Sequence, residues 1–329
     1  MKAPEFWYKP PGAAAVLLSP AGWLFAAAGR LRMASAQPER LRVPVICIGN
    51  LVAGGAGKTP VALAVAQALG TRQVHFLTRG YGGREAGPLR VDPTRHDATD
   101  VGDEALLLAG ARPTWVARDR VAGGRAAQDA GAEVIIMDDG FQNPALAKDL
   151  SLLVVDGGAG FGNRHVIPAG PLREPIEAGL DRADAVVVLG QDRCGTADLI
   201  GSRRPILHAR LVPAPGAAEA LRGQRVVAFA GIGRPAKFFA TVEELGADLI
   251  ERIAFADHHP YVPDEIMRMV EFAAASGAKL VTTAKDAVRL PEQARGMVEV
   301  VPVSVVWDDP AALDRVLAPC LTEAAGHGR

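Results

Sequence analysis

A glycine-rich segment, GNLVAGGAGKTP at residues 49–60, carries the residue types needed to bind a nucleoside triphosphate. It follows an apolar run and precedes a helical pattern, which is the context of a phosphate-binding loop. Its backbone N–H groups would hold phosphate oxygens, Lys58 would bridge the β- and γ-phosphates, and the Thr59 hydroxyl would ligate Mg²⁺. The usual pattern has glycine at position 52, where this chain has Val52. The predicted nucleotide-binding residues are Gly54, Gly55, Ala56, Gly57, Lys58 and Thr59.

A second segment, VIIMDDGFQ at residues 134–142, is an apolar run that ends in two carboxylates. A strand end of this kind holds Mg²⁺ beside the hydroxyl of a phosphate-binding loop. Taken alone, Asp138 and Asp139 fit a turn or a helix cap better than a metal site. Because a phosphate-binding loop precedes them, the metal role becomes the better interpretation.

Two further segments contain candidate acid–base residues. In VGDEALLLA at residues 101–109, Asp103 and Glu104 open a helical run, where they could cap the helix, act as a base or ligate a metal. In FADHHPY at residues 255–261, adjacent histidine side chains diverge and no further ligand pair is nearby, so a metal site is not expected. His258 fits either a histidine oriented by an aspartate beside a reacting hydroxyl or a solvated turn.

Two weaker patterns point to loops rather than to a second cofactor. RVVAFAGIGRPA at residues 225–236 has the outline of a dinucleotide-binding turn, but Pro235 interrupts it, and we do not expect dinucleotide binding. The loop IPAGPLREP at residues 167–175 is stiffened by proline and carries Arg173, which it could present to a ligand.

The strands and helices that carry these residues can be predicted from alternating patterns in the sequence. Continuous apolar runs predict strands buried on both faces, and Ala/Leu-rich stretches such as 59–70 predict the helices between them. This order predicts an α/β fold with a parallel sheet and helices on both sides. The predicted strands are 43–50, 73–80, 113–119, 132–139, 149–156 and 183–190, followed by a second block at 205–213, 225–232, 247–256, 278–284 and 298–307.

The first 42 residues carry four more basic than acidic side chains around an uncharged stretch of 20 residues, 10–29. This stretch could form a helix lying in the bilayer interface, a buried core helix, or a membrane span or signal. Its prolines argue against a span or a signal, and the interfacial helix is the favoured interpretation. The apolar residues that would enter the lipid are Val16, Leu17, Leu18, Trp23, Leu24 and Phe25, with Arg30 and Arg32 at the headgroups.

Length and composition exclude several classes of protein. A chain of 329 residues suits two domains, and 49% hydrophobic residues exclude wholesale disorder. A net charge of −1 argues against bulk nucleic-acid binding. The three scattered cysteines form no CxxC pair, so neither a disulfide framework nor a zinc ribbon is expected, and a reducing cytosol fits.

Eight segments, in this order, together resemble the tetraacyldisaccharide 4′-kinases, the lipid A 4′-kinases of Gram-negative bacteria. They are GNLVAGGAGKTP, TRGYGG, VGDEALLLA, DDGFQN, IPAGPLREP, AFAGIGRPAKFF, FADHHPY and TTAKDAVRL. The resemblance runs from the N-terminal apolar segment to about residue 307. It implies a kinase of lipid A biosynthesis that uses ATP and Mg²⁺ and transfers the γ-phosphate to the 4′-hydroxyl of a tetraacyldisaccharide 1-phosphate.

The resemblance also implies a fold and a location. We expect a P-loop NTPase-type domain with a parallel sheet, a second, smaller α/β/α domain and an N-terminal membrane-associating helix. The enzyme is expected at the cytoplasmic face of the bacterial inner membrane, in contact with the membrane surface and its lipid substrate, without nucleic acid or an obligate protein partner. The predicted boundaries are 1–36 for the helix, 37–195 for the first domain, 196–224 for a linker and 225–329 for the second domain.

Site residues follow from the resemblance, motif by motif. Asp103 matches the acid proposed to take the substrate proton, and His258 matches the histidine that pairs with it. The family usually has histidine at position 143 and glutamate at position 284. This chain has Asn143 and Ala284, so it lacks that imidazole and that carboxylate, while Lys285 and Asp286 of the same motif remain. The predicted catalytic residues are Lys58, Asp103 and His258; the predicted metal ligands are Thr59, Asp138, Asp139 and Glu104; the predicted substrate contacts are Tyr81, Arg173 and Gln142.

Two other functions stay open on the residues alone. A nucleotide-switched, membrane-associated P-loop ATPase or GTPase would hydrolyse nucleotide without any lipid. A soluble kinase of a small polar metabolite would bury the N-terminal apolar segment in its core and would work without detergent.

Overall fold

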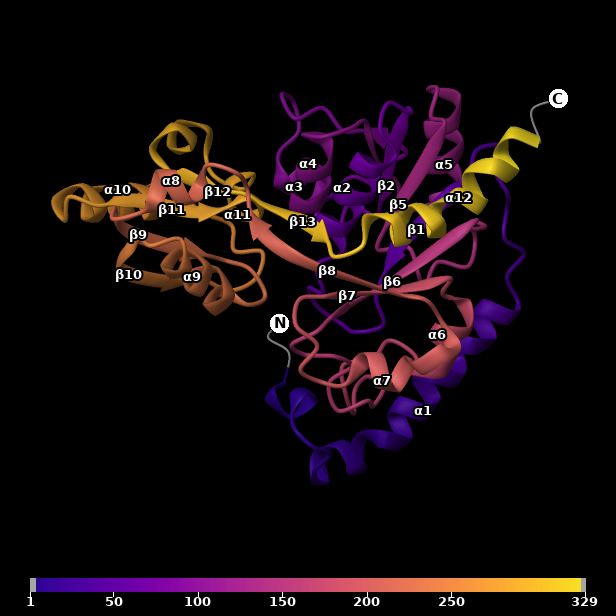
Figure 1. Cartoon of the computed structure of the whole chain (residues 1–329). Helices are drawn as coiled ribbons and strands as arrows, with labels where there is room; N and C mark the ends of the chain where they lie inside the picture. The colour runs from indigo at the N-terminus through magenta and orange to yellow at the C-terminus, as the bar shows by residue number, and fades with distance from the viewer. Residues whose placement is uncertain (1–3, 327–329) are drawn as a thin grey trace.

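The computed structural model describes residues 4–326, so the ends of the predicted segments 1–36 and 225–329 lie outside the described residues. Two sheets organise the chain, one for each of two domains (Figure 1). The larger sheet has nine strands in the order β13-β8-β7-β6-β1-β5-β2-β4-β3. These strands are β1 (Val45–Gly49), β2 (Val74–Thr78), β3 (Leu89–Arg90), β4 (Thr114–Val116), β5 (Val134–Asp138), β6 (Leu150–Asp156), β7 (Ala185–Leu189), β8 (Ile206–Pro213) and β13 (Val303–Trp307).

The interior of this sheet is parallel, as the apolar runs predict. Among the strands that the structure describes, only the pairs β13–β8 and β3–β4 at the two edges of this sheet are antiparallel. Strands β1 and β5 lie side by side with Ile48 opposite Asp138. The loop after β1 and the acidic end of β5 therefore emerge at the same edge of the sheet, which brings the phosphate-loop motif and the two aspartates together.

Helices cover both faces of the large sheet. Apolar side chains of α2, α4 and α12 pack in the core on one face, and those of α5, α6 and α7 pack on the other. The helix predicted over 59–70 is present as α2. The helices are α2 (Lys58–Ala68), α3 (Ala98–Val101), α4 (Asp103–Ala109), α5 (Arg120–Asp129), α6 (Ile176–Arg182), α7 (Thr196–Ile200) and α12 (Pro310–Gly326), with 3-10 turns η1 (Glu5–Tyr8) and η2 (Gly201–Arg203).

The smaller sheet has the order β10-β9-β11-β12 and is parallel throughout. Strand β9, one of its two inner strands, carries Val227 and Phe229 into one apolar layer and Val226 and Ala228 into the other. The elements of this domain are α8 (Ala217–Leu221), β9 (Arg225–Ala230), α9 (Pro235–Glu244), β10 (Asp248–Ala254), α10 (Pro263–Ala275), β11 (Lys279–Thr283), α11 (Ala284–Ala287), η3 (Glu292–Met297) and β12 (Glu299–Val301).

The sheets divide the chain differently from the predicted boundaries. Residues 206–213, placed in the linker, form β8 of the large sheet, and residues 303–326, placed in the second domain, form β13 and α12 of the first. The single strand predicted over 298–307 is two strands in different sheets, because Pro302 between them offers no N–H to a ladder. Strands β8 and β13 therefore lead into and out of the second domain (Figure 1).

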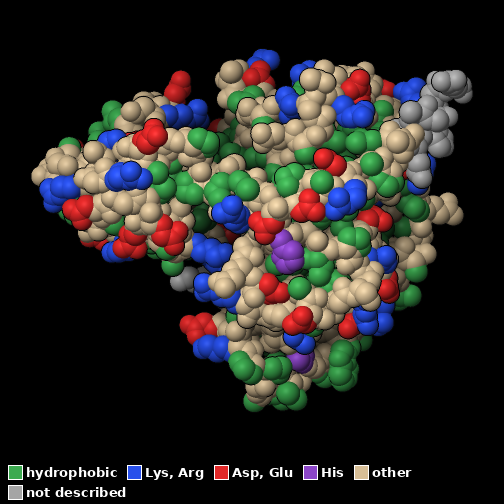
Figure 2. Space-filling view, in the orientation of Figure 1, with side chains coloured by type: hydrophobic (Ala, Val, Ile, Leu, Met, Phe, Trp, Pro, Cys, Tyr) green, Lys and Arg blue, Asp and Glu red, His purple; other side chains and the backbone are tan. Residues whose placement is uncertain are grey.

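The uncharged N-terminal stretch forms α1 (Ala13–Ala34), which runs along the outside of the first domain (Figure 1). This helix has 22 residues, and its most apolar stretch of 18 residues has a mean hydropathy of 1.4, which would suffice to cross a membrane. Only 17% of that stretch is buried. The interpretation as a buried core helix is therefore wrong. Figure 2 shows apolar side chains gathered at this edge of the molecule. The exposed apolar residues of α1 are Val16, Leu17, Leu18, Trp23, Leu24, Phe25 and Leu31.

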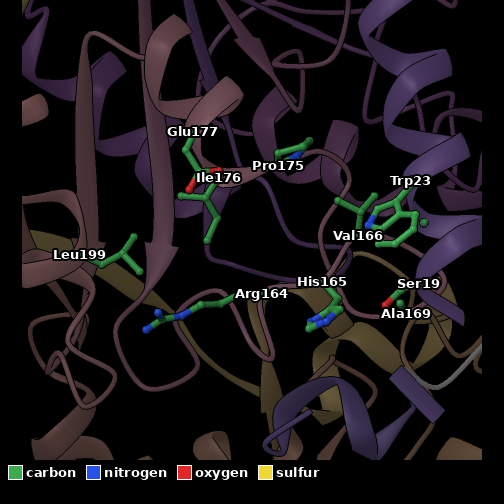
Figure 3. Close-up of a pocket in the computed structure, with 11 residues that line it drawn as sticks. Ser19, Trp23, Arg164, His165, Val166, Ala169, Pro175, Ile176, Glu177 and Leu199 are labelled. Carbon is green, nitrogen blue, oxygen red and sulfur yellow. The ribbon is translucent and has the colours of Figure 1, made fainter. Parts of the chain in front are cut away.

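One side of α1 is fixed to the first domain. A Cβ atom at Gly22 would lie 2.8 Å from the carbonyl oxygen of Val166, so only glycine permits this approach. Beside this contact lies a cavity of about 380 Å³, which is lined by Trp23 of α1, by Arg164 and His165 of the loop that precedes α6, and by the first residues of α6 (Figure 3). None of the predicted site residues lines this cavity. Near the end of α1, Arg32 donates a hydrogen bond of 3.1 Å to the carbonyl oxygen of Gln142.

Candidate active site

The phosphate loop joins β1 to α2 and has the backbone shape that its glycines permit. Gly57 has φ 84°, and a Cβ atom there would lie 2.3 Å from Cδ2 of Leu189, so this position requires glycine. Val52 forms a β-bridge with Leu172, and the N–H of Ala53 donates to Pro171. Position 52 is thus an extended edge that a β-branched residue suits, which explains why glycine is not needed there.

Lys58 and Thr59, at the start of α2, meet the acidic end of β5. The Thr59 hydroxyl donates a hydrogen bond of 2.9 Å to Oδ2 of Asp138, and Nζ of Lys58 lies 3.5 Å from Oδ1 of Asp139. The Arg173 guanidinium also donates to Oδ1 of Asp139, at 2.8 Å. The structure therefore brings together the lysine, the hydroxyl and the two carboxylates that two separate motifs predicted.

The oxygen atoms at this point fit a magnesium ion. Oδ1 of Asp138 is buried and has no hydrogen-bond partner, so it is free to ligate a cation. Within residues 4–326, no three His, Cys, Asp or Glu side chains form a group that could enclose a metal. Mg²⁺ uses one or two protein oxygens together with substrate phosphates and water, and Thr59 and Asp138 could supply those protein oxygens.

The two neighbouring aspartates have opposite electrostatic environments. Burial, together with the charges of Glu104 and Asp139, raises the pKa of Asp138 to about 7 against the opposing effect of Lys58. Burial also acts on Asp139, but there Lys58 and Arg173 together outweigh it and hold the pKa below its ordinary value. A cation bound at Asp138 would supply the positive charge that this carboxylate lacks.

Asp138→Asn is expected to stabilise the magnesium-free protein above neutral pH. Between a free-group pKa of 3.8 and a folded-state pKa of about 7, the folded chain binds the extra proton, so stability falls as the pH rises through this range. Without that ionisable group, Tm should rise by about 2–4 °C at pH 8 and by less at pH 5. Thermal unfolding in a chelator measures this. Asp139→Asn is the control and should lower Tm at pH 8; a fall for both variants would contradict the prediction.

A second cluster joins the two domains. Asp103 begins α4 in the first domain, and His258 lies in the loop after β10 in the second. Nδ1 of His258 is 2.8 Å from Oδ2 of Asp103, whose side chain is only 3% exposed. His258 adopts φ 59°, and its backbone N–H donates to the carbonyl oxygen of Gly231. The loop thus holds the histidine in a strained conformation that turns its ring toward Asp103.

Positive charges surround Asp103. Nε of Arg289 lies 3.6 Å and Nζ of Lys285 lies 3.9 Å from its Oδ2. Burial raises the pKa of Asp103, but the hydrogen bond from His258 and the charges of Lys285 and Arg289 together outweigh burial and hold this pKa below its ordinary value. Asp103 is therefore an ionised, buried carboxylate, the form that can accept a proton.

Lys285 is itself surrounded by carboxylates. Burial lowers its pKa, but Glu104, Asp103 and Asp257 outweigh burial and raise it. Glu104 lies between the two clusters: its Oε1 is 3.6 Å from Nζ of Lys285, and its charge acts on Asp138. Glu104 thus connects the cluster around Asp103 to the phosphate-loop side of the site.

The three predicted substrate residues differ in their surroundings. Tyr81 is 67% exposed, and its ring centroid lies 5.6 Å from that of His258, so the phenol is available at the edge of the site. Arg173 is held by Asp139. Gln142 accepts from Arg173 at 3.2 Å and donates to Glu174 at 3.0 Å, so its amide links neighbouring side chains.

Sequence reasoning missed Lys285 and Arg289 as site residues, although TTAKDAVRL was among the motifs that carry the resemblance. Asn143 and Ala284, the two residues that depart from the family's motifs, both lie in local structure that accommodates them. Oδ1 of Asn143 accepts the N–H groups of residues 145 and 146 and closes a turn. Ala284 is the first residue of α11, which Thr283 caps.

Known proteins resemble this chain along almost all of its length. The chain is 59% identical to the tetraacyldisaccharide 4′-kinase of Rhodospirillum centenum, covering 100% of this chain and 99% of that one. It is 56% identical to the protein of the same name from Rhodospirillum rubrum, covering 96% and 97%. A crystal structure of LpxK from Aquifex aeolicus, in complex with ATP, matches with a TM-score of 0.76 and 25% identity over 93% of this chain and 99% of that one.

The structural match confirms the predicted α/β fold of P-loop type. The family model described as Tetraacyldisaccharide-1-P 4′-kinase matches residues 14–322, which include both clusters and almost all of α1. The resemblance predicted from eight ordered motifs is therefore confirmed, and the chain belongs to the tetraacyldisaccharide-1-P 4′-kinase family.

Proposed function

We propose that this chain transfers the γ-phosphate of ATP to the 4′-hydroxyl of a tetraacyldisaccharide 1-phosphate, with Asp103 as the base. The observation that carries the proposal is the contact of 2.8 Å between Asp103 and His258, which unites one residue from each domain. Glu104, the neighbour of Asp103, acts on Asp138 beside the phosphate loop. This supports a site in which a base faces the end of a bound triphosphate.

The proposed step is attack of the sugar hydroxyl on the γ-phosphorus. A new O–P bond forms, the bond to the β–γ bridging oxygen breaks, ADP leaves, and the hydroxyl proton passes to a carboxylate oxygen of Asp103. Lys58 and the loop N–H groups offset the negative charge that develops on the phosphate oxygens. Mg²⁺ held by Thr59 and Asp138 would neutralise further phosphate charge. His258 keeps the Asp103 carboxylate oriented, and such a base contributes about 10²–10⁴-fold to the rate.

We further propose that α1 places the enzyme on the cytoplasmic face of the bacterial inner membrane. An acylated disaccharide leaves the bilayer at a cost of about 0.8 kcal/mol per CH₂ group, so the enzyme must act at the membrane surface. The exposed apolar side chains of α1 provide a face that can enter the lipid, and Arg30 can contact anionic headgroups. ATP is available on the cytoplasmic side.

Incubation with ATP labelled at the γ-phosphate tests the function. The acceptors are tetraacyldisaccharide 1-phosphate in detergent, the same lipid already phosphorylated at the 4′-position, and small polar sugars. Label is expected only in the first lipid, with little ATP hydrolysis in its absence. Hydrolysis without lipid would favour a nucleotide-switched ATPase, and label in a soluble sugar would favour a metabolite kinase; either result would refute the proposal.

Replacing three exposed residues of α1 tests its role at the membrane. Leu17→Ser, Trp23→Ser and Leu24→Ser combined should move most of the protein from floated anionic vesicles into the soluble fraction, because each lost side chain removes about 1.5–3 kcal/mol of apolar burial. These substitutions leave the contact of Arg32 with Gln142 in place.

The control combines Met267→Ser, Phe272→Ser and Met297→Ser, which removes exposed apolar side chains from the second domain instead. This control should float like the unmodified protein. Unchanged flotation of the α1 variant would show that α1 does not anchor the protein.

A further inference from the structure

We propose that Lys285 is a positioning residue whose ammonium group holds the His258 imidazole in the orientation and tautomer that Asp103 requires. The inference rests on the proposed function, in which Asp103 is the base and His258 is its partner. Lys285 lies on α11 of the second domain. Its Nζ is 3.4 Å from Nε2 of His258 and 3.6 Å from Oε1 of Glu104 in the first domain. One ammonium group therefore contacts both sides of the domain junction.

The two ring nitrogens of His258 face groups of opposite type. Nδ1 is 2.8 Å from Oδ2 of Asp103, and because an ionised carboxylate only accepts hydrogen bonds, Nδ1 must carry the proton. Nε2 faces the ammonium of Lys285, which only donates, so Nε2 must present its lone pair. Asp103 and Lys285 therefore select the same neutral tautomer from opposite edges of the ring.

Asp257 would favour the other tautomer of His258, with the ring proton on Nε2. Its Oδ2 lies 3.8 Å from Nε2 of His258 and would favour a proton there. Its Oδ1 lies 3.6 Å from Nζ of Lys285, so the ammonium engages this carboxylate as well as the ring. Without Lys285, the charged contact that remains at Nε2 is Asp257. If the single ring proton moved to Nε2, the lone pair of Nδ1 would face Asp103, and the contact between the two domains would become repulsive.

Arg289 is the other cation beside Asp103, but it is already fully engaged. Its guanidinium donates to the carbonyl oxygen of His259 at 3.0 Å and to that of Gly231 at 2.8 Å, and it pairs with the buried Asp286. These bonds hold it on the Asp103 side of the ring. It therefore cannot take the place of Lys285 at Nε2.

Nuclear magnetic resonance of the full chain in detergent, labelled with ¹⁵N in histidine, tests the assignment without any substrate. Long-range ¹H–¹⁵N spectra report which ring nitrogen carries a proton, and loss of a signal in His258→Gln identifies His258. At pH 8, Nδ1 is expected to be protonated and Nε2 unprotonated. In Lys285→Met, the Nε2 signal should move toward the protonated position. Lys279→Met removes a lysine that pairs with Glu299 on the same domain and should leave the signal unchanged.

Kinetics provide a second measurement. Lys285→Met should lower kcat by about tenfold or more, whereas KM for ATP should stay within about twofold, because the nucleotide site is intact. Lys285→Arg restores the charge, so it should keep the wild-type nitrogen signals and recover most of kcat; it also tests the proposal if the methionine variant does not fold.

An unchanged Nε2 signal or an unchanged kcat in folded Lys285→Met would overturn the proposal, and so would a displaced nitrogen signal in Lys285→Arg. If the unmodified chain phosphorylated no lipid, the proposed function would fail, but the nitrogen signals would still decide the role of Lys285.

Discussion

Lys58→Met is expected to lower kcat/KM for lipid phosphorylation at least about a hundredfold, which is the usual effect of losing one preorganised donor at a developing negative charge. The side chain of Lys58 is only 8% exposed, and its Nζ lies beside Asp139 at the start of α2. Water cannot replace this charge well, because the site around it is largely buried. Methionine keeps the length of the side chain and removes only the charge.

Folding should survive this change, since Arg173 still pairs with the Asp139 carboxylate. Initial rates against ATP and lipid measure the effect, and circular dichroism checks the fold. Lys279→Met, an exposed lysine of the second domain, is the matched control and should retain its activity. Near-normal turnover of folded Lys58→Met would remove this lysine from the mechanism.

The large sheet could be predicted from sequence because parallel strands are buried on both faces and read as unbroken apolar runs. Strands β1, β2, β5 and β7 are fully buried, and their positions were predicted to within a few residues. The edge pair β8–β13 could not be predicted in this way. These two strands are about 90 residues apart and antiparallel, and only long-range pairing decides which sheet each one joins.

The phosphate loop could be predicted because its function depends on neighbouring residues. Glycines, a lysine and a threonine in one segment determine the backbone shape and the charge together. The pair Asp103–His258 spans 155 positions, and spacing alone left Asp103 open between a helix cap and a base. Only the resemblance to a family suggested this pair. Lys285 was assigned no function, because a lysine within a short helix has no local pattern that distinguishes it from a solvated charge.

The two domains meet through several ion pairs besides the contact between Asp103 and His258. Asp156, at the end of β6, accepts from Arg234 at 3.1 Å and from Lys237 at 2.8 Å, both near the start of α9. The chain enters the second domain directly after β8 and leaves it directly before β13, so two chain segments connect the domains. These contacts hold the second domain beside the phosphate-loop edge of the first. The pair that we propose as catalytic, Asp103 and His258, can then form although each domain supplies only one of its two residues.

Asp103→Asn is expected to lower kcat at least about a hundredfold, because the amide cannot accept the hydroxyl proton, and a general base contributes about 10²–10⁴-fold. The pKa of Asp103 is held low by His258, Lys285 and Arg289, although burial alone would raise it. The carboxylate therefore stays ionised between pH 6 and 8, and protonation of Asp103 should not reduce the rate of the unmodified enzyme in that range. Asparagine is nearly isosteric, so the packing around α4 should persist.

The matched control is Asp97→Asn, at the N-terminal cap of α3 six positions earlier, where asparagine caps as well as aspartate. It should keep both its stability and its kcat. If Asp103 and His258 act as a unit, Asp103→Asn combined with His258→Gln should cost little more than Asp103→Asn alone, since the second change removes support for a base that is already absent. Rates that multiply in the double variant would show that His258 acts on the substrate independently, and a folded Asp103→Asn enzyme with normal kcat would rule Asp103 out as the base.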